Sequence, residues 1–228
     1  MTAFKDLPLR ERKASRTRLA IYEAGRELLR EKSLAQIKIE EICERADISR
    51  GTFFSYFSRK KDLIIYAIRI WSIEAGWEMA GMPGETLGLA CIETIFKRLG
   101  QSMGDDPFFW QELLAIRIFE PRTMHLLNQN KISMVTPGDK LLWFPDKPGI
   151  EDFPEGTIVT YLRENLEIAV DKGELPGAIP VDSVLISLTS ILYGAPVMLA
   201  GYTELETLAD EYTTQLKILW AGLRSLYL

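Results

Sequence analysis

The chain has 228 residues, a net charge of −5, 47% hydrophobic residues and 26% charged residues. These values are typical of a folded globular protein, and they argue against a disordered chain, which lacks the apolar surface needed to offset its ordering entropy. The two cysteines are too few for a disulfide framework, and the arginine-rich first 20 residues have no apolar core region, which argues against a secretory signal. We therefore expect a cytoplasmic protein.

Charge is distributed unevenly along the chain. Residues 1–61 contain 15 Lys/Arg and 9 Asp/Glu, whereas residues 62–228 contain 12 Lys/Arg and 23 Asp/Glu. The N-terminal quarter is therefore basic and the rest is acidic. Such a division suggests that one end of the protein meets a polyanion, although a solvated charged helix without a partner would show the same balance.

Apolar residues recur at helical spacing along most of the chain, and no strand alternation of useful length is present. We expect an all-α protein of about nine helices. A long loop is expected at 136–154, which contains six proline and glycine residues. The expected helices cover residues 14–32, 39–46, 50–56, Ser58 to about 81, 85–103, 107–120, 122–135, 155–173, 181–201 and 204–227.

The segment from Lys38 to Leu63, KIEEICERADISRGTFFSYFSRKKDL, predicts two short helices joined by a tight turn. Asp47 stands in the turn, and aspartate tolerates the left-handed backbone region better than most residues. With Phe53 and Phe57 packed inward, the second helix is suited to the DNA major groove, which is the geometry of a helix-turn-helix. Two such helices could instead belong to a core, but adjacent aromatic residues cannot all face inward.

The outward side of the second helix carries residue types that bind DNA. An arginine such as Arg50 can pair with guanine through two hydrogen bonds, and Gly51 permits close approach of the helix. Tyr56 and Lys60 are suited to phosphates. The predicted DNA-binding residues are Lys38, Ser49, Arg50, Gly51, Thr52, Phe54, Ser55, Tyr56 and Lys60.

The segment resembles the DNA-binding domain of the TetR family of bacterial transcriptional regulators. The family pattern Ala-Gly-Val-Ser, Lys/Arg-Gly-Thr-Leu-Tyr, aromatic or His, Phe corresponds here to ADISRGTFFSYF at 46–57, followed by Lys60 and Leu63. The resemblance covers about residues 14–70. Asp47 replaces the usual glycine, Phe54 replaces the usual tyrosine, and Lys38 replaces a frequent capping threonine. These departures bear on operator preference.

The resemblance implies a DNA-binding domain at 1–62, with its motif at about 37–57, and a dimerising, effector-binding domain at 63–228. It also implies a homodimeric repressor that a small-molecule inducer releases from a palindromic operator. Trp71, Trp77, Phe109, Trp110 and Trp143 are candidates for an apolar or aromatic ligand, because aromatic-lined clefts hold such molecules. The alternative for each of them is ordinary core packing.

Residues 184–202 contain no charge and are long enough to span a bilayer, but their flanks are Asp182 and Glu204. Polar residues, glycines and Pro196 dilute the segment, so we expect no membrane span. A two-fold four-helix bundle formed with residues 204–227 would bury it. The predicted dimerisation residues are Leu188, Leu192, Leu216, Leu219 and Leu223.

Enzymatic motifs are lacking: the sequence has no phosphate-binding glycine loop, nucleophile elbow or paired metal-ligand motif. The single histidine, His125, has no cysteine or carboxylate residues around it at the spacing of metal ligands. We expect no catalytic activity, cofactor or metal. One alternative from another class stays open, a ligand-sequestering or protein-interaction module that does not bind an operator.

Overall fold

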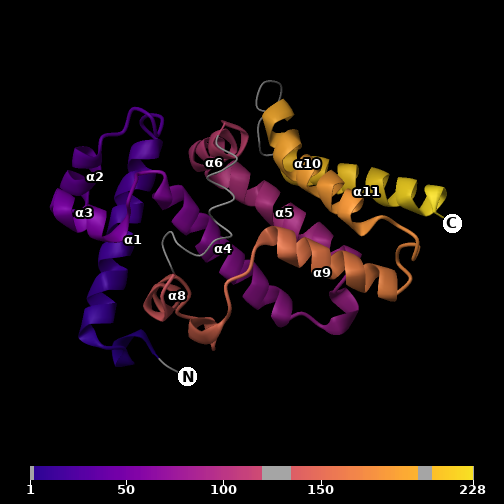
Figure 1. The fold of residues 1–228 in the computed structure, drawn as a ribbon, viewed down its shortest axis with the longest axis horizontal. Coiled ribbons are helices and arrows are strands. Elements are labelled where there is room, and N and C mark those ends of the chain that lie inside the picture. Colours follow the sequence, from indigo (N-terminus) through magenta and orange to yellow (C-terminus); the bar gives the residue numbers. More distant parts are fainter. Residues whose placement is uncertain (1–2, 120–134, 200–206, 228) are drawn as a thin grey trace. The chain divides into compact units, whose positions relative to one another are not determined.

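The computed structural model describes residues 3–119, 135–199 and 207–227. Those residues form ten α-helices and three short 3₁₀ helices without any strand, which confirms the predicted all-α class (Figure 1). The 3₁₀ helices are Phe4–Asp6, Gly84–Thr86 and Ile150–Asp152. The α-helices are α1 (Leu9–Leu29), α2 (Ile39–Arg45), α3 (Arg50–Tyr56), α4 (Asp62–Ala80), α5 (Leu89–Asp105), α6 (Pro107–Phe119), α8 (Pro137–Trp143), α9 (Ile158–Asp171), α10 (Val181–Leu199) and α11 (Leu208–Leu226).

Most expected helices are present with shifted ends. The first helix begins at Leu9, five residues before its expected start, and α6 begins at Pro107 as predicted. Proline suits the first position of a helix because its missing N–H would have no intrahelical partner there. The helix expected at 122–135 lies mostly outside the described residues, as do His125 and the start of the helix expected at 204–227.

The prediction of a long loop at 136–154 is wrong, because α8 and a 3₁₀ helix occupy much of this segment. Thr136 caps α8: its hydroxyl accepts the Asp139 N–H at 3.3 Å, and the Asp139 carboxylate accepts the Thr136 N–H at 2.8 Å. Pro137 occupies the first helical position. This reciprocal cap is a helix-start signal, and it outweighs the proline and glycine content of the segment.

The chain packs as two units, one formed by Met1–Glu74 with Phe108–Glu155 and the other by Ala75–Pro107 with Gly156–Leu228. Residues 63–74 thus pack with the N-terminal part of the chain. The domain boundary expected between residues 62 and 63 stays a prediction.

In the first unit, α1 is the element on which α2 and α8 pack, and α3 packs on α2 (Figure 1). Gly25 lets α4 approach α1, since a Cβ at this position would lie 2.6 Å from Cδ1 of the buried Leu63. The predicted apolar stripe of α1 is buried, including Ile21 and Leu28.

In the second unit, α11 packs along α5, while α10 contacts both α9 and α11 (Figure 1). The buried Tyr212 hydroxyl donates to the Leu192 carbonyl at 2.7 Å, and its ring meets Phe96 edge to face. Gly100 sits against the backbone of Ala209, so α5 and α11 approach each other at van der Waals contact.

Helix α10 is long and apolar enough to cross a membrane by length and composition, with a mean hydropathy of 1.5. Core helices and interface helices of proteins outside membranes pass the same test. Pro196 lies inside α10.

Gly100 provides a test of this close packing. A Cβ at residue 100 would lie 2.7 Å from the Ala209 Cα, which belongs to the backbone and cannot rotate away. We expect Gly100→Ala to lower the free energy of unfolding by about 1–3 kcal/mol, the usual cost of overpacking. Chemical denaturation measures this change.

Gly51→Ala in α3 is the matched control, because the one heavy atom near its ideal Cβ position is the Ser49 side-chain oxygen at 3.7 Å, an ordinary van der Waals contact. Removing a helical glycine there should raise stability by up to about 1 kcal/mol. Equal effects of the two substitutions would contradict the contact between α5 and α11.

Candidate nucleic-acid interface

The turn between α2 and α3 has the predicted geometry. Asp47 has a φ of 53°, which is the left-handed region, and it is the one non-glycine residue with positive φ among the described residues. The Ile48 N–H donates to the Cys43 carbonyl at 3.0 Å and closes the turn. A glycine would adopt this backbone without steric cost, so the aspartate carries some backbone strain.

Two phenylalanines attach α3 to the first unit. Phe53 and Phe57 are both fully buried, and the Phe57 ring meets Tyr66 of α4 edge to face at 5.7 Å. Burying a phenylalanine contributes about 1.5–3 kcal/mol. Because these residues lie four apart, they point to the same side of the helix and leave the opposite side exposed.

Capping ties down the first turn of α3. The Ser49 side chain accepts the Thr52 N–H at 3.1 Å, and the two hydroxyl oxygens lie 2.9 Å apart. The Ser55 hydroxyl donates to the Gly51 carbonyl at 2.9 Å. These hydroxyls therefore already make local hydrogen bonds, and each keeps acceptor capacity for a DNA group.

At the start of α2 the Lys38 side chain makes no capping bond. Instead the Glu41 carboxylate accepts the Lys38 N–H at 2.8 Å and also pairs with Lys32. The Lys32 bond, together with the Lys38 N–H, lowers the pKa of Glu41. Glu41 thus makes its own half of a capping box, whereas the Lys38 side chain does not accept the N–H of the first turn that a threonine hydroxyl would accept.

The residues of α3 that were predicted to face DNA are exposed or partly exposed. Arg50, Gly51, Phe54 and Ser55 are exposed, and Thr52 and Tyr56 are partly exposed. Phe54 is 47% exposed, which is unusual for a large aromatic side chain and suits contact with a base or sugar. Ser49 and Lys38 are exposed as well.

Arg50 forms an ion pair with Glu40 of α2 at 2.6 Å. The Arg50 side chain is 63% exposed. An exposed pair of this kind contributes only about 0–1 kcal/mol, so a phosphate or a guanine edge can replace Glu40 at low cost. Burial raises the pKa of the Cys43 thiol, and the nearby Glu40 charge raises it further.

Lys60 is placed differently from the sequence expectation. Its Nζ donates to the Ala35 carbonyl at 2.9 Å and to the Ile37 carbonyl at 2.7 Å. Two of its three donors therefore hold the segment before α2, which leaves one for a phosphate. Its phosphate contact stays a prediction, and the structure adds a role in supporting the helix-turn-helix.

Sequence reasoning missed Arg18 of α1. The Arg18 guanidinium carbon lies 5.5 Å from the centroid of the Tyr56 ring in α3, and the guanidinium pairs with the buried Asp139 of α8. Arg18 belongs to a run of basic residues that looks uniformly solvated in sequence. No local pattern indicates a partner 121 residues away.

The candidate ligand residues separate into groups. Trp71 of α4 stacks on Trp110 at 5.0 Å and meets Phe109 at 4.8 Å, so these three form one aromatic cluster. Trp143 lies in another cluster, with Tyr22 and Tyr66, and donates to the Tyr66 hydroxyl at 3.1 Å. Trp77 belongs to the second packing unit. Their ligand-binding role stays a prediction.

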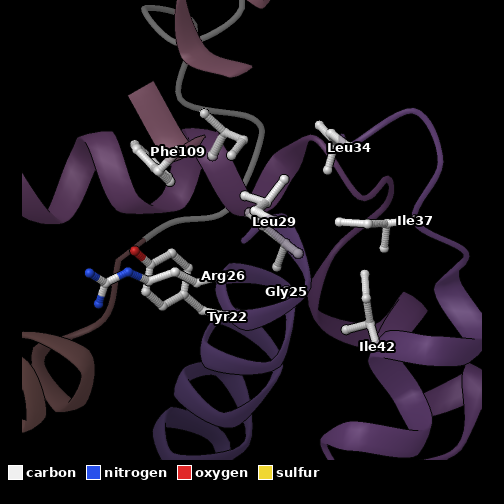
Figure 2. Close-up of a pocket in the computed structure, with 10 residues that line it drawn as sticks. Tyr22, Gly25, Arg26, Leu29, Leu34, Ile37, Ile42 and Phe109 are labelled. Carbon is white, nitrogen blue, oxygen red and sulfur yellow. The ribbon is translucent and has the colours of Figure 1, made fainter. Parts of the chain in front are cut away.

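Two hollows differ in size. A cavity of about 10 Å³ lies between α1, α4 and α6, lined by Tyr22, Leu29 and Phe109 among others (Figure 2). It has room for about one water molecule. An open hollow of about 370 Å³ lies in the second unit between α5 and α11, with Trp220, Glu93 and Lys217 in its lining. Only the second has the volume of a small-molecule site.

The predicted dimerisation residues mostly face the core of one chain. Leu188, Leu192, Leu216 and Leu223 are buried within the second unit, and Leu219 is half-buried. The outward side of α10 and α11 carries other apolar residues: Ile186, Val197, Met198, Ile218 and Leu226 are exposed. Helical periodicity located the apolar helices, but it did not distinguish the side that faces the chain's own core from the side that faces solvent.

Within the described ranges, no three His, Cys, Asp or Glu side chains gather as a metal site would require.

The helix-turn-helix segment matches a known family of regulators. Residues 21–67 match the family described as "Bacterial regulatory proteins, tetR family". The solved structure of Salmonella enterica GusR is similar, with 19% identity, a TM-score of 0.62 and coverage of 92% of this chain and 95% of that chain.

A TetR family transcriptional regulator from Chloroflexus aurantiacus has 18% identity and a TM-score of 0.47, with coverage of 97% of this chain and 96% of that chain. No curated protein matches the sequence significantly. The family match contains α2, α3 and the turn between them.

Proposed function

Because the helix-turn-helix segment of this chain belongs to the tetR family of bacterial regulatory proteins, we propose that the protein is a cytoplasmic transcriptional repressor. It binds a palindromic operator as a homodimer and leaves it when a small molecule binds. One observation carries the DNA-binding part: α3 is anchored by Phe53 and Phe57, so Arg50 and Phe54 face outward on a unit with a basic N-terminal segment. Basic charge attracts the phosphate backbone, and the outward side chains of α3 read base edges.

The Arg50 side chain tests DNA recognition. We expect Arg50→Ala to weaken binding to a duplex selected from a random pool by about 1–3 kcal/mol and to relax preference at one base pair of each half-site. The reason is that a bidentate arginine pair discriminates guanine from other bases. Fluorescence anisotropy with single-base operator variants measures both effects.

Arg98→Ala is the matched control, since Arg98 is also an exposed, ion-paired arginine but lies in α5. It should leave the affinity and the base preference unchanged. A loss of affinity from Arg50→Ala that is the same for every sequence would contradict a base-reading role.

The dimer is proposed to form through the exposed apolar side of α10 and α11. Ile218 is 63% exposed, so Ile218→Glu should leave the protomer folded. If Ile218 is buried in a dimer, the new carboxylate raises the dimer dissociation constant about tenfold or more. Sedimentation equilibrium measures this constant.

Leu9→Glu is the control, because it also places a carboxylate at an exposed apolar residue, here in α1. Equal effects of Ile218→Glu and Leu9→Glu on the dimer dissociation constant would contradict the assignment of the interface to α10 and α11.

Ligand release is proposed from the family relationship, and α4 offers the physical route because it begins beside α3 and continues through Trp71 and Trp77. A ligand moves the protein off DNA only if it binds the two arrangements with different affinity. By reciprocity, operator DNA should then weaken ligand binding by about 5–150-fold. Calorimetry on a small molecule that copurifies, with and without operator, tests this. Identical affinities in the two titrations would contradict ligand-induced release.

A further inference from the structure

Residues 135–155 form a segment that lies against α1 and α4 of the first unit, and we call it the strap. Its helix α8 packs on α1. The Gly138 N–H donates to the Glu11 carboxylate at 3.1 Å, and the Thr136 and Ser15 hydroxyl oxygens lie 3.4 Å apart. A Cβ at Gly138 would lie 2.6 Å from the Ser15 hydroxyl, so the two helices are in direct contact.

The strap is folded onto itself as well as onto α1. The Lys140 side chain is buried, and its ammonium donates to the Glu151 carbonyl at 3.2 Å and to the Phe153 carbonyl. The last residue of α8, Trp143, donates to the Tyr66 hydroxyl at 3.1 Å. The strap therefore holds a defined position on α1 and α4.

At the centre of this contact, Asp139 pairs with Arg18. The Asp139 carboxylate is fully buried, and the Arg18 side chain is 12% exposed. A buried charge that loses its partner is left without compensation, so each member strongly constrains where the other can lie. Asp139 therefore determines the position of the Arg18 guanidinium.

Arg18 also contacts α3. Its guanidinium carbon lies 5.5 Å from the Tyr56 ring centroid, within the range of a cation–π contact. Tyr56 is the last residue of α3 and is partly exposed. A chain of two contacts thus connects Asp139 of the strap to a side chain on the DNA-facing helix.

We propose that Asp139 is a positioning residue for DNA binding: through Arg18 it holds Tyr56 in the orientation in which the Tyr56 hydroxyl contacts a phosphate. The strap thereby sets how tightly α3 binds DNA. This inference rests on the proposed DNA-binding function. The α3 backbone is already anchored by Phe53 and Phe57, so the Asp139 pair acts on the Tyr56 side chain rather than on the presence of α3.

A double-mutant cycle separates positioning from general support. Asp139→Asn removes the charge and keeps an oxygen that can accept the Thr136 N–H, which Asp139 accepts at 2.8 Å. The other carboxylate oxygen accepts no hydrogen bond among the described residues. The NH₂ group that replaces it in asparagine therefore does not face a hydrogen-bond donor. Tyr56→Phe removes only the hydroxyl and keeps the ring beneath Arg18.

The affinities of the four proteins for a selected duplex and for its scrambled counterpart are measured by fluorescence anisotropy at one salt concentration. In the wild-type background, Tyr56→Phe should weaken binding to the selected duplex about tenfold, as expected for a hydrogen bond to a charged group. In the Asp139→Asn background it should weaken binding less than about twofold, because a hydroxyl that is out of position contributes little.

Glu155→Gln is the control, because it also removes the charge that pairs with a buried arginine. Glu155 pairs with Arg69 at 3.2 Å within the same unit. In that background, Tyr56→Phe should keep its full effect. If Asp139→Asn fails to fold by circular dichroism, Arg18→Lys replaces it. That variant keeps the positive charge without the planar guanidinium, and it should abolish the Tyr56 effect in the same way.

Three results would overturn the inference. Independent effects of Asp139→Asn and Tyr56→Phe would make the pair a structural support only. Tighter DNA binding by Asp139→Asn would mean that Asp139 restrains Arg18 from a phosphate. A wild-type protein that does not distinguish the selected duplex from the scrambled one would overturn both the proposed function and this inference, whereas the first two results leave DNA binding intact.

Discussion

Two phenylalanines one helical turn apart decide which side of α3 meets solvent. Phe53 and Phe57 are fully buried, and together they contribute about 3–6 kcal/mol of apolar burial. The exposed Arg50–Glu40 pair contributes at most about 1 kcal/mol, so it adjusts the surface without determining it. The whole DNA-facing set depends on this anchoring, because rotation of α3 would bury those side chains.

Local chemistry in the sequence is sufficient for the helix-turn-helix. Asp47 permits the left-handed turn, Ser49 caps α3, and the apolar positions of α1 and α2 repeat with helical spacing. All of these signals act within a few residues, so they can be read without knowing the fold. The assignment of the outward residues of α3 follows from the same periodicity, since burying Phe53 and Phe57 fixes the side on which Arg50 and Phe54 lie.

Contacts between distant segments could not be predicted in this way. Lys60 donates to carbonyls 23 and 25 residues earlier in the chain, and Arg18 meets Asp139 across 121 residues. A loop was predicted for the strap because the segment is rich in proline and glycine, although the capping residue Thr136 is visible in the sequence. The leucines of α10 and α11 show the same limit, because periodicity identifies an apolar side but not whether the chain's own core or a second copy covers it.

If the exposed side of α3 lies in the DNA, a cleavage probe attached to that side cuts the DNA backbone nearby. Cys43 and Cys91 are buried, and burial raises the pKa of both thiols, so an added surface cysteine reacts selectively. Ser55→Cys carries an iron-chelate cleavage probe on the outward side of α3, and Gln101→Cys, at an exposed position of α5, carries the same probe as a control. We expect the probe at residue 55 to cut within each half-site of a selected duplex and the probe at residue 101 not to cut. Cleavage from residue 101 with none from residue 55 would show that α3 does not face the DNA.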